Sequence, residues 1–97
     1  RIIPLNGVYV GYAWVGEERY QTVMNIGVRP TFGDHKRLLE AHLLNFDGDL
    51  YGTDLLVEFV ERLRPETRFD SAQELIAQMH GDMAHGREIL AAEAEAH

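Results

Sequence analysis

The chain contains no cysteine among its 97 residues, which excludes disulfide bonds and cysteine-based zinc or redox sites. Basic residues are few, and the net charge of −7 argues against non-specific binding to nucleic acid or to anionic membranes. No apolar run approaches the length of a membrane-spanning helix, and no signal peptide is recognisable. A cysteine-free composition fits a reducing compartment, so we expect a cytoplasmic protein.

What remains is the composition of one small globular domain. The hydrophobic share of 45% is too high for a disordered chain, and 97 residues bury only a modest core. The sequence opens at Arg1 without a methionine. We therefore expect residues 1–97 to be a single domain cut from a longer protein, as its C-terminal part.

Alternating apolar residues and β-branched residues predict four strands, at about 7–15, 19–26, 37–45 and 54–64. The first two strands form a predicted hairpin around Gly16. We expect a loop over 27–36, because Pro30 cannot donate to a strand ladder. Glu61 breaks the alternation of the fourth strand, and a bulge near Val60 would explain the break.

After the strands the apolar period becomes helical. Ser71 followed by Glu74 forms a capping box, and one amphipathic helix is predicted over about 71–92, with a frayed tail. Its methionines are predicted to pack in the core. Gly86 lies on the apolar stripe, where it would let a strand approach closely. Strands followed by one helix predict a mainly β fold, an antiparallel sheet closed into a small barrel with a helix over one side.

One carboxylate stands out because it lies mid-strand among leucines. A charge at Glu40 is costly there, and partial desolvation would raise its affinity for a proton, so Glu40 is a candidate catalytic base. The residues alone leave open an ordinary solvent-facing Glu on an edge strand. Glu40 and His42 share a strand face and could form half of a metal site, but no second pair at ligand spacing is evident.

The segment after the third strand comes close to a calcium-binding loop. Asp47, Asp49, Gly52 and Glu58 stand at the first, third, sixth and twelfth positions. Tyr51 at the fifth position is wrong for that motif, and its flanks are predicted to be strands rather than helices. A glycine-punctuated hairpin loop is therefore the favoured interpretation.

Five short segments, in this order and spacing, resemble riboflavin kinase, the kinase found alone in eukaryotes and as the C-terminal half of bacterial riboflavin kinase/FAD synthetase. They are Asn-Gly-Val-Tyr-Val-Gly-Tyr-Ala at 6–13, Asn-Ile-Gly-Val-Arg-Pro-Thr-Phe at 25–32, Leu-Glu-Ala-His-Leu-Leu at 39–44, Asp-Gly-Asp-Leu-Tyr-Gly at 47–52 and Leu-Arg-Pro-Glu-Thr-Arg-Phe-Asp-Ser at 63–71. The resemblance implies a six-stranded Greek-key β-barrel with a C-terminal helix. It also implies transfer of the ATP γ-phosphoryl group to the 5′-hydroxyl of riboflavin, giving FMN, with Mg²⁺.

The resemblance assigns roles to individual residues and to partners. It implies that Glu40 is the catalytic base, which takes the proton of an alcohol that is otherwise a poor nucleophile. Nucleotide contacts are implied at His42, Phe46 and Tyr51, and flavin contacts at Arg64, Arg68 and Phe69. The expected partners are riboflavin, ATP and a covalently linked FAD synthetase (adenylyltransferase) domain, with no nucleic acid and no membrane.

One departure from the family pattern changes the expectation for these residues. The family has a Gly-x-Pro-Thr-Ala-Asn segment that holds Mg²⁺ and the ATP phosphates and begins the barrel, and this sequence contains none; Pro30 and Thr31 precede Phe32 in a different loop. We therefore expect no metal ligand within the chain, an open edge in the barrel, and little turnover by these residues alone. A non-catalytic module that binds flavin, nucleotide or a partner protein remains an alternative.

Overall fold

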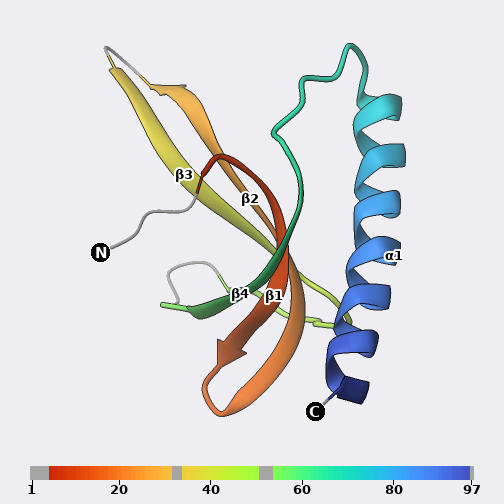
Figure 1. The fold of residues 1–97 in the computed structure, drawn as a ribbon. Coiled ribbons are helices and arrows are strands. Elements are labelled where there is room, and N and C mark those ends of the chain that lie inside the picture. The colour runs from red at the N-terminus through yellow and green to blue at the C-terminus, as the bar shows by residue number, and fades with distance from the viewer. Residues whose placement is uncertain (1–4, 32–33, 51–53, 97) are drawn as a thin grey trace.

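A computed structural model describes residues 5–31, 34–50 and 54–96, which form an antiparallel sheet with one long helix along one side (Figure 1). The elements are β1 (Gly7–Val15), β2 (Glu18–Thr31), β3 (Asp34–Leu43), β4 (Leu56–Arg64) and α1 (Ala72–Ala96). The spatial order β3-β2-β1-β4 places β1 and β2 in the centre of the sheet. The four predicted strands and the predicted helix are thus confirmed as elements.

The β1–β2 hairpin is tight because Gly16 takes a conformation that other residues resist. Val15 pairs with Glu18, so two residues make the turn, and Gly16 has a φ of 62°. A positive φ at the first turn position matches the right-handed twist of the two strands. The hairpin predicted around Gly16 is therefore confirmed.

The loop predicted over 27–36 is wrong for most of its length. Strand β2 continues to Thr31, and its last residues pair with the first residues of β3. Pro30 is tolerated because β1 begins at Gly7, opposite Ile26, so among the described residues that part of β2 pairs with β3 alone. The sequence pattern missed this extension because it depends on pairing with β3, not on local preference.

Strand β4 contains two irregularities in its pairing with β1. Val60 and Leu63 have no partner in the register, and both side chains pack under the helix against Val10 and Tyr12. An extra residue reverses which side chains face the core. The bulge predicted near Val60 is confirmed, whereas the second one carried no signal in the sequence.

Helix α1 begins as the capping box predicts. The Glu74 amide donates to the Ser71 hydroxyl at 3.2 Å, and the Glu74 carboxylate accepts from the Asp70 amide at 3.2 Å. The helix continues to Ala96, so the tail predicted to fray is helical instead. Alanine and glutamate are strong helix formers, which accounts for the extension. No helix in the described part of the chain is long and apolar enough to span a membrane.

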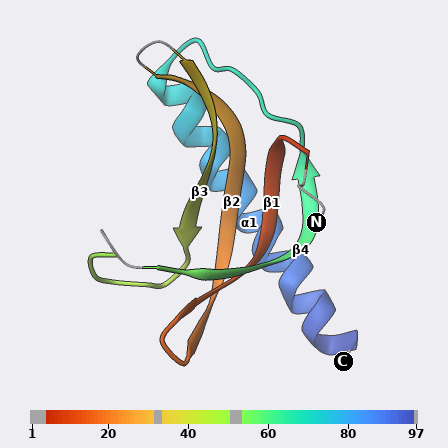
Figure 2. The same cartoon turned by 90° about the vertical axis from the view of Figure 1, so that its left-hand side faces the viewer.

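The sheet buries apolar side chains on both faces. On the helix side the cluster consists of Val10, Tyr12 and Leu90, and on the other side of Tyr9, Met24 and Ile26, against which Phe59 packs. Figure 2 shows α1 running behind the sheet, which curves but does not close among the described residues. The closed barrel that the resemblance implies is therefore not formed by these strands, while the mainly β class and the open edge agree with expectation.

Candidate active site

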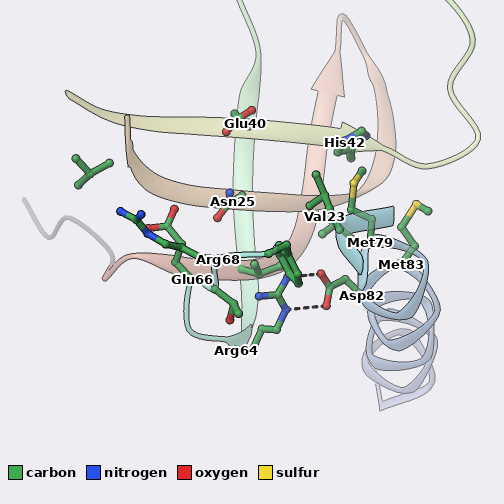
Figure 3. A pocket seen from close by; sticks show the side chains of 15 residues that line it. Val23, Asn25, Glu40, His42, Arg64, Glu66, Arg68, Met79, Asp82 and Met83 are labelled. Atoms are coloured by element: carbon green, nitrogen blue, oxygen red, sulfur yellow. Dashed lines mark hydrogen bonds and ion pairs between the residues drawn. The ribbon is translucent and has the colours of Figure 1, made fainter. Parts of the chain in front are cut away.

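A cavity of about 650 Å³ lies between the helix side of the sheet, the first half of α1 and the segment that joins β4 to α1 (Figure 3). Volumes of this order are typical of small-molecule sites. The lining side chains come from β1 to β3 (Val8, Val23, Asn25, Val28, Glu40, His42), from 64–69 (Arg64, Glu66, Thr67, Arg68, Phe69) and from α1 (Leu75, Met79, Asp82, Met83).

The floor of the cavity is set by strand register. Val8 on β1 pairs with Asn25 on β2, which in turn pairs with Glu40 on β3. Paired residues point to the same face of a sheet, so the three side chains form one row. The neighbouring row ends in Val23 and His42, which also pair. Polar groups therefore gather toward β3, and valines lie toward β1.

The opposite wall is apolar and comes from the helix. Leu75, Met79 and Met83 border the cavity from α1, and Phe69 borders it from the connecting segment. Leu75 remains 42% exposed because the sheet does not reach it. A flat apolar ring system could bind against this wall, because the contact would bury apolar surface of the ring and of the wall side chains.

An ion pair ties this wall to the sheet. Arg64 at the end of β4 donates to both carboxylate oxygens of Asp82 on α1, at 3.0 and 2.7 Å (Figure 3). Gln78 donates to the same carboxylate at 3.0 Å. Asp82 is buried, and its side chain is 8% exposed against 22% for Arg64. A two-bond guanidinium–carboxylate pair fixes orientation as well as distance. Arg64 also donates to the Pro65 carbonyl at 3.1 Å, which orients the start of the connecting segment.

Five of the seven predicted site residues meet at this cavity: Glu40, His42, Arg64, Arg68 and Phe69. Glu40 is exposed, so this structure gives it little of the desolvation expected from a mid-strand position. Phe46 is not among the lining residues and packs edge-on against Tyr20, with ring centroids 5.1 Å apart. Tyr51 lies outside the described residues. The roles assigned to all seven stay predictions.

Several lining residues were missed by sequence reasoning. Asn25 stood only as the first residue of the family-like segment at 25–32 and was given no role. Asp82 carried no signal, because a single polar residue in a helix is usually a surface residue. Met79 and Met83 were predicted to pack in the core, but they are half-buried and face the cavity. Only the register of the strands and the position of α1 bring these side chains together.

Metal-binding interpretations gain no support from the described residues. No group of three His, Asp or Glu side chains within 5–31, 34–50 and 54–96 is arranged to hold a metal ion. Tyr51 and Gly52 of the calcium-like spacing lie outside those ranges, and strands β3 and β4 flank that segment where a calcium loop needs helices.

Two tyrosines distant from the cavity have perturbed acidity. Burial, followed by the charge of Glu93, raises the pKa of Tyr12, whose hydroxyl donates to that carboxylate at 3.3 Å. A hydrogen bond of 2.7 Å to Glu18 raises the pKa of Tyr20. Both phenols are therefore neutral donors at physiological pH.

Comparison with known families settles the relationship of this chain. The model of the flavokinase family, described as riboflavin kinase, matches residues 1–90. The chain belongs to the riboflavin kinase family. Within that family it is 45% identical over 92 residues to the bifunctional riboflavin kinase/FMN adenylyltransferase of Pseudomonas fluorescens, covering 94% of this chain and 30% of that protein. The human riboflavin kinase is 37% identical over 86 residues, covering 87% of this chain and 56% of that protein.

A solved structure shares the same fold. A protein from Streptococcus pneumoniae, described as a macrolide-efflux protein, superposes with a TM-score of 0.81 at 29% identity, over 89% of this chain and 28% of that protein. The riboflavin kinase domain thus spans about 30% of its bifunctional relatives and about half of the human enzyme.

Proposed function

We propose that this domain transfers the γ-phosphoryl group of ATP to the 5′-hydroxyl of riboflavin, giving FMN and ADP. The observation that carries the proposal is the position of Glu40. The carboxylate that the family resemblance makes the base lines a cavity whose opposite wall is apolar. One site therefore offers a surface for a flat ring and a proton acceptor for an alcohol.

The apolar residues and the carboxylate of the cavity would have different roles. Leu75, Met79, Met83 and Phe69 would pack on the isoalloxazine ring, which buries apolar surface without demanding charge. Glu40 would accept the proton of the 5′-hydroxyl as its oxygen attacks the γ-phosphorus. The bond from that phosphorus to the bridging oxygen then breaks, and ADP leaves. Alignment of the reactants and neutralisation of the phosphate charge supply the rest of the catalysis.

Magnesium is expected with ATP, where it would neutralise charge on the phosphates. It generally binds proteins through one or two oxygens together with the phosphates. Within residues 5–31, 34–50 and 54–96 no three His, Asp or Glu side chains lie together, and we assign no magnesium ligand among them. His42 is a polar group of the cavity that we propose for contacts with the nucleotide, and Arg68 is proposed to contact the flavin.

The wider setting follows from the bacterial relatives. Because they carry both riboflavin kinase and FMN adenylyltransferase in their names and are about three times as long as the matched region, we propose a linked adenylyltransferase domain in this protein as well. Such an enzyme would pass FMN to the second activity and would act in the cytoplasm.

The decisive experiment is Glu40→Gln in the full-length protein. The amide keeps the shape of the carboxylate but cannot accept the proton, so FMN production should fall by roughly two to four orders of magnitude while riboflavin still binds. Glu58→Gln is the matched control, because Glu58 is an exposed strand carboxylate outside the cavity and should leave turnover within about two-fold. FMN formation and riboflavin affinity are both measured.

Each outcome has a distinct meaning. An unchanged rate in Glu40→Gln removes Glu40 from the mechanism. A wild-type protein that binds riboflavin but makes no FMN from Mg-ATP supports the alternative of a non-catalytic flavin-binding module. A wild-type protein that binds no flavin contradicts the assignment of this cavity.

A further inference from the structure

The floor of the cavity contains a polar atom that the fold does not satisfy. The side-chain oxygen Oδ1 of Asn25 is buried and accepts no hydrogen bond from any residue that the structure describes. A buried acceptor without a donor costs about 1–3 kcal/mol, so unpaired atoms of this kind are rare in native proteins and call for an explanation, such as a bound ligand or water. Asn25 also lines the cavity, and a rotation of its amide about the Cβ–Cγ bond would turn Oδ1 toward a ligand bound there.

The position of Asn25 connects it to the proposed reaction. It pairs directly with Glu40 across the β2–β3 ladder and with Val8 across the β1–β2 ladder. Directly opposite residues have Cβ atoms about 4.5–5.5 Å apart, so a ligand group beside Glu40 is also beside Asn25 (Figure 3). On its other side the row is apolar, and Val8 offers Asn25 no donor.

The ligand group that fits must donate a hydrogen bond next to a hydroxyl. Oδ1 is an acceptor only, and the group that delivers its proton to Glu40 is itself a hydroxyl. A sugar-alcohol chain carries hydroxyls on adjacent carbons, so one can lie at Glu40 while a neighbour donates to Asn25. The flat ring would lie across the cavity, against the apolar wall formed by α1 and Phe69, which leaves the sugar-alcohol chain as the part of the flavin beside Asn25.

We propose that the Asn25 side-chain oxygen accepts a hydrogen bond from a second hydroxyl of the flavin's ribityl chain and so determines which hydroxyl lies beside Glu40. This inference rests on the proposed function and assigns Asn25 to substrate recognition. Asn25 takes no part in the transfer of the proton or of the phosphoryl group. Its effect is to restrict the ribityl chain to one bound position, which lowers the entropy cost of reaching the reactive geometry.

The test compares two ligands that share a ring. Riboflavin carries the ribityl chain, and lumiflavin carries a methyl group in its place, so their affinity ratio isolates the contribution of the chain. The variant is Asn25→Leu in the full-length protein, which keeps the side-chain shape but removes the acceptor. Asn25→Asp is the matched control, because it keeps an oxygen at the same place. Affinities come from flavin fluorescence titration or calorimetry.

Asn25→Leu should weaken riboflavin binding by roughly ten-fold, since a ligand hydroxyl is then buried without an acceptor, and should change lumiflavin binding by less than about two-fold. Asn25→Asp should retain more of the riboflavin preference than Asn25→Leu. If Asn25→Leu does not fold, Asn25→Val is the second acceptor-free variant, because β-branched residues are favoured in strands.

Two results would overturn the inference. Equal losses for riboflavin and lumiflavin would mean that Asn25 only supports the cavity, and an unchanged riboflavin affinity would mean that no contact exists. Either result, in a wild-type protein that still makes FMN, leaves the proposed function standing. Failure of the wild type to bind riboflavin would instead overturn the proposed function, and this inference with it.

Discussion

The two halves of helix α1 carry the same kind of apolar stripe but meet the sheet differently. In the C-terminal half, Leu90 is fully buried and Gly86 lies against Val10 and Val23. In the N-terminal half, Leu75 borders the cavity and is 42% exposed, and Ile76 is 52% exposed. One half stabilises the domain, and the other forms a binding wall. The comparison shows that spacing alone does not say which role a stripe has.

The boundary between the two halves coincides with the ion pair of Arg64 and Asp82. Asp82 lies one helical turn before Gly86, and it is held by two hydrogen bonds from the end of β4. C-terminal to Asp82 the helix contacts the sheet closely, and N-terminal to Asp82 the cavity lies between the helix and the sheet. Three variant pairs test this division, from the largest expected effect to the smallest.

Leu90→Ala and Leu75→Ala remove the same atoms from the two halves. Leu90→Ala should lower the free energy of unfolding by about 2–5 kcal/mol, because it leaves a cavity in the core. Leu75→Ala should lower it by less than about 1 kcal/mol but should weaken flavin binding, because Leu75 lies on the cavity wall. Urea unfolding and riboflavin titration measure the two effects. Equal losses of stability would show that the halves do not differ.

Arg64→Ala, Asp82→Ala and their double variant test the boundary. Each single change should cost about 1–3 kcal/mol, less than a fully buried pair because the Arg64 side chain is 22% exposed. The double variant should cost less than the sum, because neither partner is then left alone. Arg87→Ala, at an exposed helix position, is the control and should change stability by less than about 0.5 kcal/mol.

If the costs of the two single variants add without coupling, the ion pair does not hold the helix to β4. Strong coupling together with a loss of riboflavin affinity would show that the pair also sets the position of the cavity wall. Retained affinity in the double variant would place the boundary elsewhere, in the packing around Gly86.

Local signals in the sequence account for most of the elements. The alternation around Gly16, the capping box at Ser71 and the broken pattern at Glu61 each depend on nearby residues, and each prediction is confirmed. The extension of β2 past Ile26 was missed because its stability comes from pairing with β3. Elements could thus be predicted wherever the cause lies within a few residues along the chain.

Site residues, too, could be predicted only where the signal lies in the nearby sequence. Glu40 was noticed because a charge among leucines is locally unusual, whereas its neighbour across the ladder, Asn25, stood only as part of a family-like segment and was given no role. Whether a side-chain amide in a strand finds hydrogen-bond partners depends on the residues that the fold places around it, and the neighbours in the sequence do not predict this. Leu75 and Leu90 have equivalent places in the helical pattern, and only the approach of the strands distinguishes them.

The smallest expected effect has opposite signs in the two halves, at the two glycines of the helix. Gly81 is exposed with open space around it, so Gly81→Ala should stabilise the domain by about 0.5–1 kcal/mol through helix propensity.

At Gly86 an added Cβ would lie 2.9 Å from a methyl group of Val10, which is fully buried and stiff. Gly86→Ala should therefore destabilise by about 0.5–2 kcal/mol, since overpacking exceeds the gain in propensity. Thermal unfolding measures both variants, and equal stabilisation by the two would mean that the helix can move away from β1 without cost, which would remove the packing difference between its halves.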